Sequence, residues 1–510
     1  MKYALDSNSM REIDNYTIDQ LKIPAMVLME RAALEVSLFM KKHIKKSDRI
    51  LVLCGPGNNG GDGIAAGRIL HLQGYQVAIF LLSNKDRASS GLKKQLEIAE
   101  RLGITIESTY KASTYNIIID ALFGVGLTRD IIGDYQKLIK QVNSENNIVF
   151  SVDIPSGISA DNGKVMNQAI KADYTITFGY MKQGLLLYPG IDYGGDITLV
   201  DIGFPKLAEK SARLDTFYYE EEDLKLLPVR HGHSHKGTYG KLLVIGGSKG
   251  MSGAAYLSAK AAYRTGVGMV KILTSTSNRE ILQTLLPEAL FSTYEDKESL
   301  KEDLNWADVI VIGPGLGTSQ EARDVLKDVI DNVNLPVIID ADGINILAMQ
   351  MDDLGIEDTR QRIEYLKGNL PVTTILTPHL KELSRLLKIP LSEISDNMID
   401  TANQCTYNNK VIFLIKDAKT VVTYNGMKYI NRSGCSGMST AGSGDVLTGI
   451  IGALIGQKMK AYKATCLATF IHGLAGQIAS AKKGEYSVIA SDILDSIEQV
   501  LMDNEGRYEG

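Results

Sequence analysis

Short runs of consecutive apolar residues, many of them rich in Val and Ile, recur along most of the chain. Strands buried on both faces have this character, because neither face of a fully covered parallel sheet meets water. Amphipathic segments such as residues 90–103 lie between several of the runs, and this alternation predicts an α/β fold with doubly wound parallel sheets. The runs cover residues 50–55, 76–82, 116–120, 147–153, 174–179 and 197–203, and then 241–247, 269–274, 308–315, 336–342, 373–379, 411–417 and 420–426.

A charged stretch, residues 206–236, interrupts the rhythm and divides the chain. A length of 510 residues suggests roughly three domains, but the pattern has only two parts. We therefore predict two α/β domains. The first, residues 1–215, is expected to be a Rossmann-like doubly wound sheet. The second, residues 225–503, ends in helices predicted over 445–456 and 463–480.

The composition limits which binding partners and which cellular compartment are expected for this chain. The chain is 44% hydrophobic and 23% charged with a net charge of −5, and it has no block of Lys and Arg, so a nucleic-acid partner is not expected. The chain has no run of 18 apolar residues, so a membrane span is not expected. The four cysteines are scattered without a C-x-x-C pair, and the N-terminus lacks the apolar stretch of a signal peptide. We expect a cytoplasmic protein that acts on small molecules.

The stretch "GPGNNGGDG", residues 55–63, follows the first apolar run. Its first six residues fit the G-x-G-x-x-G dinucleotide fingerprint, which is weak on its own. An ordinary Rossmann site also needs an acid at the end of the second strand. In this chain the candidate acid, Asp86, comes several residues after that strand, in a polar loop. A generic anion-binding turn is the alternative. Asn58 and Asn59 add amide groups, and Asp62 is predicted to cap the start of the following helix.

Charged residues follow three further predicted strands of the first half. Asp120 ends the run 116–120, Asp153 ends 147–153, and Lys182 comes just after 174–179. Ligands of open α/β sheets bind beyond the carboxyl ends of the strands, so these side chains are candidates for one site. A single Asp after a strand is usually a turn former, but several such groups beside glycine-rich loops favour a functional site.

The second half carries the sharper motif, "TAGSGDVLTGIIGALIG", residues 440–456. Backbone N–H groups of Gly442 to Gly444 at a helix N-terminus would form an anion hole. Asp445 beside it could accept a proton from an attacking hydroxyl. A plain glycine-rich helix cap is the alternative. The G-S/T-G-D arrangement is similar to that of the ribokinase-like fold, where such an Asp activates a substrate alcohol toward a nucleotide phosphate.

Residues 1–210 resemble the NAD(P)H-hydrate epimerase domain, the YjeF N-terminal family, through "GPGNNGGDG", "DALFGVGL", "VDIPSG" and "FGYMKQGLLLYPG" in this order. The resemblance implies a hydrated, damaged NAD(P)H as the ligand. It also implies that Asn59, Asp120 and Ser156 hold a potassium ion. The substrate-binding residues that it implies are Asn58, Asn59, Gly60, Gly61, Asp62, Gly124, Val125, Gly126, Leu127, Thr128, Arg129, Asp130 and Asp153.

Epimerisation of such a hydrate needs an acid/base group, because the ring nitrogen expels the C6 hydroxyl and water returns on the other face. We expect Asp120 to supply this group, with Lys182 assisting. The alternative is that Asp120 serves only the ion.

Residues 225–500 resemble the NAD(P)H-hydrate dehydratase family through "VIGPGLG", "IDADGINIL", "LTPHLKEL", "IKDAKTVV" and "AGSGDVLTGIIGALI". The resemblance implies that phosphorylation of the hydrate is followed by loss of phosphate. ADP is the expected nucleotide, because a fused chain resembles the prokaryotic enzymes, and Mg²⁺ is expected with it. By resemblance the hydrate contacts are Ala255, Gly317, His379 and Asp445, and the nucleotide contacts are Lys416, Asp417, Ala418, Lys419, Thr420 and Gly444.

The sequence thus predicts a bifunctional enzyme that repairs NADH and NADPH hydrates. It would epimerise the R and S forms and dehydrate the S form, converting ADP to AMP and phosphate. One rival is a ribokinase-like kinase of a small alcohol such as a vitamin, with a nucleotide-binding first domain. Another is a nucleotide-sensing scaffold without turnover. A homo-oligomer is expected.

Overall fold

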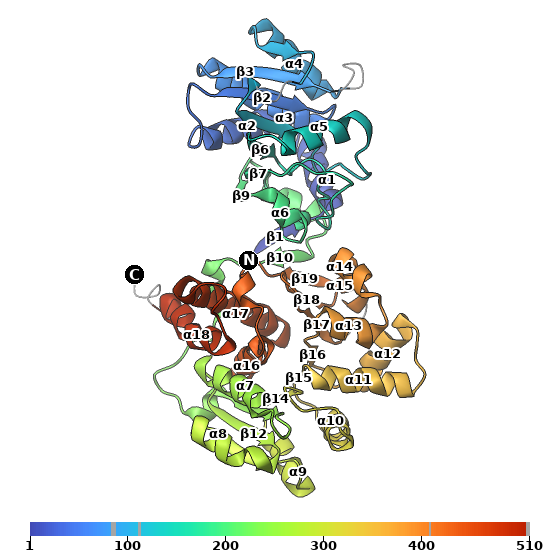
Figure 1. The fold of residues 1–510 in the computed structure, drawn as a ribbon, viewed down its shortest axis with the longest axis vertical. Helices are drawn as coiled ribbons and strands as arrows, with labels where there is room; N and C mark the ends of the chain where they lie inside the picture. The colour runs from blue at the N-terminus through green and yellow to red at the C-terminus, as the bar shows by residue number, and fades with distance from the viewer. Residues whose placement is uncertain (83–87, 111–113, 407–409, 506–510) are drawn as a thin grey trace. The chain divides into compact units, whose positions relative to one another are not determined.

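The computed structural model describes residues 1–82, 88–110, 114–406 and 410–505, which form two compact units (Figure 1). The N-terminal unit is Tyr3–Thr216. The C-terminal unit is Met1–Lys2 together with the chain from Phe217 onward. Asp86 lies outside the described residues.

The N-terminal unit is built on a seven-stranded sheet in the order β4-β3-β2-β5-β6-β7-β9. All neighbouring strands in it are parallel. The strand order runs outward in both directions from β2 and β5, so the switch point lies between these two strands. Its strands are β2 (Arg49–Cys54), β3 (Gln76–Leu81), β4 (Thr105–Glu107), β5 (Ile117–Ala121), β6 (Ile148–Val152), β7 (Tyr174–Phe178) and β9 (Asp196–Val200).

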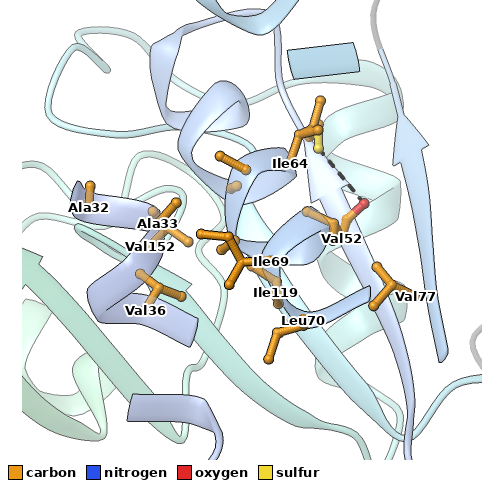
Figure 2. Packing of buried hydrophobic residues seen from close by; sticks show 14 of the residues in the cluster. Ala32, Ala33, Val36, Val52, Ile64, Ile69, Leu70, Val77, Ile119 and Val152 are labelled. Carbon is orange, nitrogen blue, oxygen red and sulfur yellow. Dashed lines mark hydrogen bonds between the residues drawn. The ribbon is translucent and has the colours of Figure 1, made fainter. Parts of the chain in front are cut away.

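Helices cover both faces of this sheet, because alternate strand residues point to opposite sides. On one face, Val52, Val77 and Ile119 lie in one buried cluster with Ile69 and Leu70 of α3, which also includes Ala33 and Val36 of α2 (Figure 2). On the other, strand residues pack against Leu138, Ile139 and Val142 of α5. The helices are α1 (Ser7–Asn15), α2 (Ala25–Met40), α3 (Asn58–Leu72), α4 (Ser90–Arg101), α5 (Gly133–Asn143) and α6 (Gly190–Gly194); strand β1 (Lys2–Leu5) pairs with β8 (Met181–Lys182).

The sheet of the C-terminal unit includes the order β13-β12-β11-β14-β15-β16-β17-β18-β19. Strands from β13 to β17 are parallel, and β18 and β19 are antiparallel additions at one end. The order turns between β11 and β14. Bounds are β11 (Lys241–Ile245), β12 (Met269–Thr274), β13 (Leu290–Thr293), β14 (Val309–Ile312), β15 (Val337–Ile339), β16 (Thr374–Leu376), β17 (Ile412–Ile415), β18 (Val421–Tyr424) and β19 (Met427–Ile430); β10 is Thr216–Tyr218.

Two long apolar helices, α16 and α17, pack against each other, and α16 also lies against α7 (Figure 1). Helix α16 is buried from Val446 to Gly456, which explains its apolar residues on all sides. The helices are α7 (Ser252–Arg264), α8 (Arg279–Leu285), α9 (Lys297–Trp306), α10 (Gln320–Asn332), α11 (Asp342–Asp353), α12 (Thr359–Asn369), α13 (Leu380–Leu387), α14 (Leu391–Asp396), α15 (Met398–Thr406), α16 (Ser443–Gly456), α17 (Ala461–Lys483) and α18 (Ala490–Glu505).

The predicted fold class is confirmed, and every apolar run predicted as a strand contains one. The analysis missed short strands such as β4 and β13, which end their sheets and have one neighbour each. Their sequences, "TIE" and "LFST", carry polar residues that a doubly covered strand would lack. Among the described residues, no helix combines the length and apolar character needed to cross a membrane.

We predict that the two units fold separately. Each has its own sheet and buried apolar core, so a chain cut within residues 212–222 should give two fragments that each unfold cooperatively. Thermal and urea unfolding of the separate fragments, followed by circular dichroism, provides the measurement. A fragment that is soluble but shows no cooperative transition would contradict this division.

Candidate functional site

Glycine is required where the loop after β2 meets the loop after β5. A Cβ on Gly55 would lie 1.8 Å from the carbonyl oxygen of Leu122, and one on Gly60 would lie 2.4 Å from the oxygen of Gly55. The glycines therefore allow two backbone segments to approach at the switch point, the usual location of ligands in such sheets. Gly61 packs against Met29 in the same way.

A cavity of about 830 Å³ opens at this point. Helices α1 and α2, which precede β2 in the chain, form part of its lining together with the loops that follow β2 and β5. Of the sequence-predicted residues, those lining it are Asn58, Asn59, Asp62, Gly124, Val125, Gly126, Leu127, Thr128, Arg129, Asp153 and Lys182. Gly60, Gly61, Asp120, Asp130 and Ser156 are not in this lining set.

Asp62 differs from its predicted role as a helix cap. Helix α3 already begins at Asn58, and its N-cap is Gly57, so Asp62 lies beyond the first turn. The prediction of a cap was wrong because the helix starts within the glycine-rich stretch. The Asp62 side chain lines the cavity instead, and burial, reinforced by Asp153 and Asp14, raises its pKa well above the ordinary value.

Asp153 lies at the cavity in a conformation that non-glycine residues rarely adopt, with φ +69°. Its Oδ1 accepts hydrogen bonds from Lys182 Nζ, from Thr177 Oγ1 at 3.2 Å and from the Phe178 N–H at 3.1 Å. Lys182 also donates to Thr177 Oγ1 and the Phe178 carbonyl, each at 3.0 Å. These contacts fix one oxygen of Asp153 and leave the other as the group available to a ligand.

Asp120 has a different environment. Its side chain is fully buried, and its carboxylate accepts from Ser151 Oγ at 2.8 Å, from Ser156 through both N–H and Oγ, and from the Leu122 N–H at 3.3 Å. Burial raises the pKa of Asp120, and these hydrogen bonds oppose that rise. With four donors on two oxygens, Asp120 is placed to fix the loops after β5 and β6.

Oxygen atoms gather next to Asp120. Ser156 Oγ lies between the Phe123 N–H, at 2.8 Å, and the Phe123 carbonyl, at 3.2 Å. The side chain of Asn59 packs against Gly124, and its buried Nδ2 has no hydrogen-bond partner in the described part of the chain. Turning that amide would present its oxygen instead, and an oxygen-rich donor set suits a hard monovalent cation.

Helix α1 adds a carboxylate that the sequence analysis missed. Asp14 lines the cavity, and burial, Asp153 and Asp19 raise its pKa. It lies on a helix rather than at a strand end, so the strand-end rule had no means of finding it. Asp14, Asp62 and Asp153 together give the cavity acidic groups that share its walls with the Lys182 ammonium.

In the C-terminal unit, α16 begins at Ser443, directly after Gly442, where the sequence analysis predicts an anion hole. Gly442 has φ +87° and precedes the helix without a side-chain cap. Ser443 Oγ lies 3.2 Å from Nε2 of His472, whose pKa burial lowers to about 4. Burial and Asp340 raise the pKa of Asp445 to about 7, with Lys416 opposing. A carboxyl group of this pKa can exchange a proton near neutral pH.

Three chain segments meet at Asp445. Lys416 follows β17, and its Nζ donates to Asp340 Oδ1 at 2.7 Å. A Cβ on Gly444 would lie 3.3 Å from that same Nζ, so the ammonium adjoins the anion hole. Thr377 after β16 also donates to Asp340 Oδ1, at 2.6 Å. Lys416 and Gly444, which the sequence placed together at the nucleotide, are brought together here.

The residues predicted to contact the hydrate are spread around this point. Gly317 has φ +76° and donates its N–H to Asp342 Oδ2 at 2.8 Å. His379 Nδ1 accepts from the first N–H groups of α13, which leaves Nε2 as the donor of the neutral ring. Burial and Lys416 lower the pKa of His379, which favours that neutral form. Ala255 is fully buried at the Gly247 turn.

The segment from Lys416 to Thr420 turns outward after Lys416. Asp417 and Ala418 are exposed, and Lys419 Nζ donates to the Arg432 carbonyl at 3.1 Å. Burial and Arg432 lower the pKa of Lys419. Of this segment, Lys416 is therefore the residue that adjoins the anion hole.

Known proteins match the chain along nearly its whole length. A family model described as NAD(P)H-hydrate dehydratase matches residues 242–499, and one described as YjeF-related protein N-terminus matches residues 25–184. The bifunctional NAD(P)H-hydrate repair enzyme of Thermofilum pendens is 33% identical over 98% of this chain and 96% of its own. That of Moorella thermoacetica is 34% identical over 99% and 98%. A solved ribokinase-like superfamily protein from Enterococcus faecalis, 25% identical, covers 57% of this chain and 96% of its own with a TM-score of 0.50.

We predict that Asp120→Asn destabilises the N-terminal unit by about 1–3 kcal/mol, because an amide nitrogen would face hydrogen-bond donors in a fully buried position. The measurement is urea unfolding of that fragment. Asp134→Asn is the control, since the exposed Asp134 carboxylate only pairs with Lys137, and its effect should stay within about 0.5 kcal/mol. Equal stabilities for the two variants would refute the structural role of Asp120.

Proposed function

The chain belongs to the family of bifunctional NAD(P)H-hydrate repair enzymes, and from this premise we propose how its two units divide the reaction. The N-terminal unit interconverts the R and S hydrates of NADH and NADPH. The C-terminal unit dehydrates the S form back to the reduced dinucleotide and consumes a nucleotide in doing so. The enzyme is thus both an isomerase and a lyase.

The cavity of the N-terminal unit supports the epimerase role. When the C6 hydroxyl takes a proton and leaves as water, the ring nitrogen stabilises the resulting cation, and a second water then adds to the other face. Asp62 and Asp14 have raised pKa values and suit the proton donor, whereas Asp153 has an oxygen free to receive a proton. We place the acid/base work on these cavity-lining groups, with Lys182 fixing Asp153.

Asp120 is then proposed for the ion rather than for proton transfer. Two observations support the potassium site that these residues were expected to form: Asp120 binds Ser156, and within the described residues Asn59 Nδ2 is buried without a hydrogen-bond partner. A cation there would hold the loops after β2 and β5 together and offset the charge of Asp120. The residues proposed to hold it are Asn59, Asp120 and Ser156.

One observation carries the dehydratase role, namely Asp445 at the anion hole with a pKa of about 7. As a base it removes the proton of the C6 hydroxyl while that oxygen attacks the β-phosphorus of ADP, which gives AMP and a phosphorylated hydrate. Phosphate then leaves with the electron pair of its C–O bond, assisted by the ring nitrogen. Loss of a proton from C5 restores NAD(P)H.

The remaining contacts follow from this arrangement. The nucleotide is proposed to lie against Lys416, Gly444 and the segment from Asp417 to Thr420. Mg²⁺ would arrive with its phosphates and neutralise them. His379, with Nε2–H as a donor, and Gly317 are proposed to contact the hydrate, and Ala255 supports the wall behind them. Family membership favours this scheme over the kinase that would release a phosphorylated alcohol.

We also propose a homo-oligomeric, cytoplasmic enzyme. The exposed apolar residues Val27, Leu34 and Leu38 share one side of α2, which suits contact with a second copy. Within the described residues the cysteines form no disulfide, which suits a reducing compartment.

Asp445→Asn should lower S-hydrate dehydration by about 10²–10⁴-fold, because Asn cannot accept the hydroxyl proton. Formation of the reduced ring is followed by absorbance, with chemically prepared NADH hydrate and with or without ADP. Asp445 works as a base only when ionised, so kcat/KM of the unmodified enzyme should rise with pH through about 7 and level off above it.

Nucleotide binding and epimerisation provide the controls for this variant. ADP binding, measured by calorimetry, should persist, since Asn retains the shape of the helix turn. Near-normal dehydration by Asp445→Asn would refute the mechanism, and accumulation of a phosphorylated product by the unmodified enzyme would select the kinase instead.

Asp153→Asn should slow epimerisation by about 10²–10⁴-fold while dehydration of the S hydrate continues at its normal rate. Asn tolerates a positive φ better than most residues, so the loop should keep its conformation. Chromatographic conversion of the R into the S hydrate measures the first activity, and absorbance measures the second. If a folded Asp153→Asn variant epimerises normally, the acid/base assignment fails.

A further inference from the structure

Asp340, at the end of β15, has no role in the scheme above, yet it is the most tightly held carboxylate near Asp445. Its side chain is 2% exposed, and Oδ1 accepts both from Thr377 Oγ1 at 2.6 Å and from Lys416 Nζ at 2.7 Å. Its other oxygen points toward the anion hole, where a Cβ on Gly444 would lie 3.8 Å from Oδ2.

The backbone that carries Asp340 is strained. Ala341 has φ +48° and ψ −114°, which a residue with a Cβ rarely adopts. This turn directs Asp340 toward Lys416 and Asp342 toward the Gly317 N–H. A glycine would remove the strain, so the surrounding packing holds an unfavourable turn that places two carboxylates at the site.

Lys416 depends on a partner for its charge. Burial alone would lower the pKa of its ammonium, but Asp340 and Glu382 outweigh burial and raise that pKa. The ammonium adjoins Gly444, where the anion hole would hold the transferred phosphoryl group. Asp340 is the largest of these anionic contributions, so its loss would lower the pKa of the Lys416 ammonium and weaken its hold on phosphate.

We propose that Asp340 is a positioning residue of the dehydratase site, which holds the Lys416 ammonium charged and aimed at the phosphoryl position of the anion hole. This inference rests on the proposed dehydratase function. Asp340 touches neither the hydrate nor the nucleotide and acts through Lys416. When nucleotide binds, its phosphate supplies Lys416 with a further anionic neighbour, so the ammonium is shared between Asp340 and the transferred group.

The same carboxylate also acts on Asp445. Four groups face Asp445 or its helix turn, and they come from different elements: Asp340 and Asp342 oppose its ionisation, Lys416 favours it, and His472 on α17 stays neutral. Removing the charge of Asp340 should therefore make Asp445 easier to ionise. The low-pH limb of kcat/KM should move to lower pH, a change that a purely structural residue would not produce.

The test is Asp340→Asn in the full chain, which retains the shape of the side chain and removes its charge. We expect the KM and the calorimetric Kd for ADP to rise about 10- to 100-fold, the range for loss of a charge-assisted hydrogen bond. The low-pH limb of kcat/KM should shift downward. In a Lys416→Met background, Asp340→Asn should add little to the loss of ADP affinity, since the two act as one unit.

Asp303→Asn is the matched control. Asp303 is 3% exposed and pairs with Lys271 at 2.5 Å in the same unit, but it lies on α9 and its partner on β12 rather than at the anion hole. Its substitution should lower stability and leave the KM for ADP and the pH profile unchanged. Thermal unfolding of each variant, followed by circular dichroism, reports whether its C-terminal unit has folded.

An Asp340→Asn variant that melts normally with unchanged ADP affinity and an unchanged pH profile would overturn the proposal. If that variant does not fold, Lys416→Met decides, because Lys416 is the group through which Asp340 acts; an unchanged calorimetric Kd for ADP there would also overturn the proposal. Failure of the unmodified enzyme to dehydrate the S hydrate would refute the proposed function instead. The calorimetric effect of Asp340→Asn on ADP would still be measurable in that case.

Discussion

Parallel strands that are covered on both faces have their carboxyl ends at one edge of the sheet, and both candidate sites lie at such an edge. In each unit the strand order turns between two central strands, and the loops after them come into backbone contact. Gly55 donates its N–H to the Ala121 carbonyl in the N-terminal unit, and Gly247 donates to the Pro314 carbonyl in the C-terminal unit. A Cβ at Gly55 or at Gly246 would collide with the opposite loop. In each unit this close approach of two loops lies at the carboxyl ends of the strands, the edge where the candidate site is found.

Hydrogen-bond donors decide what a buried carboxylate can do at that edge. Asp120 meets four donors and is held as part of the structure, whereas Asp62 and Asp445 meet burial and like charge, which raise their pKa values. The same side chain therefore serves either to fix a loop or to carry a proton. Burial, reinforced by Coulomb repulsion between neighbouring carboxylates, raises the pKa values of Asp62 and Asp445.

Each site also contains a buried ammonium group that is held by a carboxylate. Lys182 binds Asp153, Thr177 and the Phe178 carbonyl, and Lys416 binds Asp340. In the first case the lysine fixes the acid that meets the substrate. In the second the acid fixes the lysine that meets the phosphate. Both sites thus use a buried lysine–carboxylate pair, but the carboxylate meets the ligand in the first site and the lysine does so in the second.

The sequence by itself determined the sheets, because consecutive apolar residues can be buried only in strands or helices covered on both sides. It also determined the glycine-rich turns, the acid Asp153 that directly follows a strand, and Asp445 in the first turn of an apolar helix. It misjudged Asp62, since the start of α3 depends on how the glycines pack, and it missed Asp14, which only the folding of α1 over the cavity brings near Asp153. The separate roles of Asp120 and Asp340 were decided by tertiary structure, because they depend on donors from distant segments, Ser156 for the one and Lys416 for the other, and no local pattern in the chain records which groups will converge.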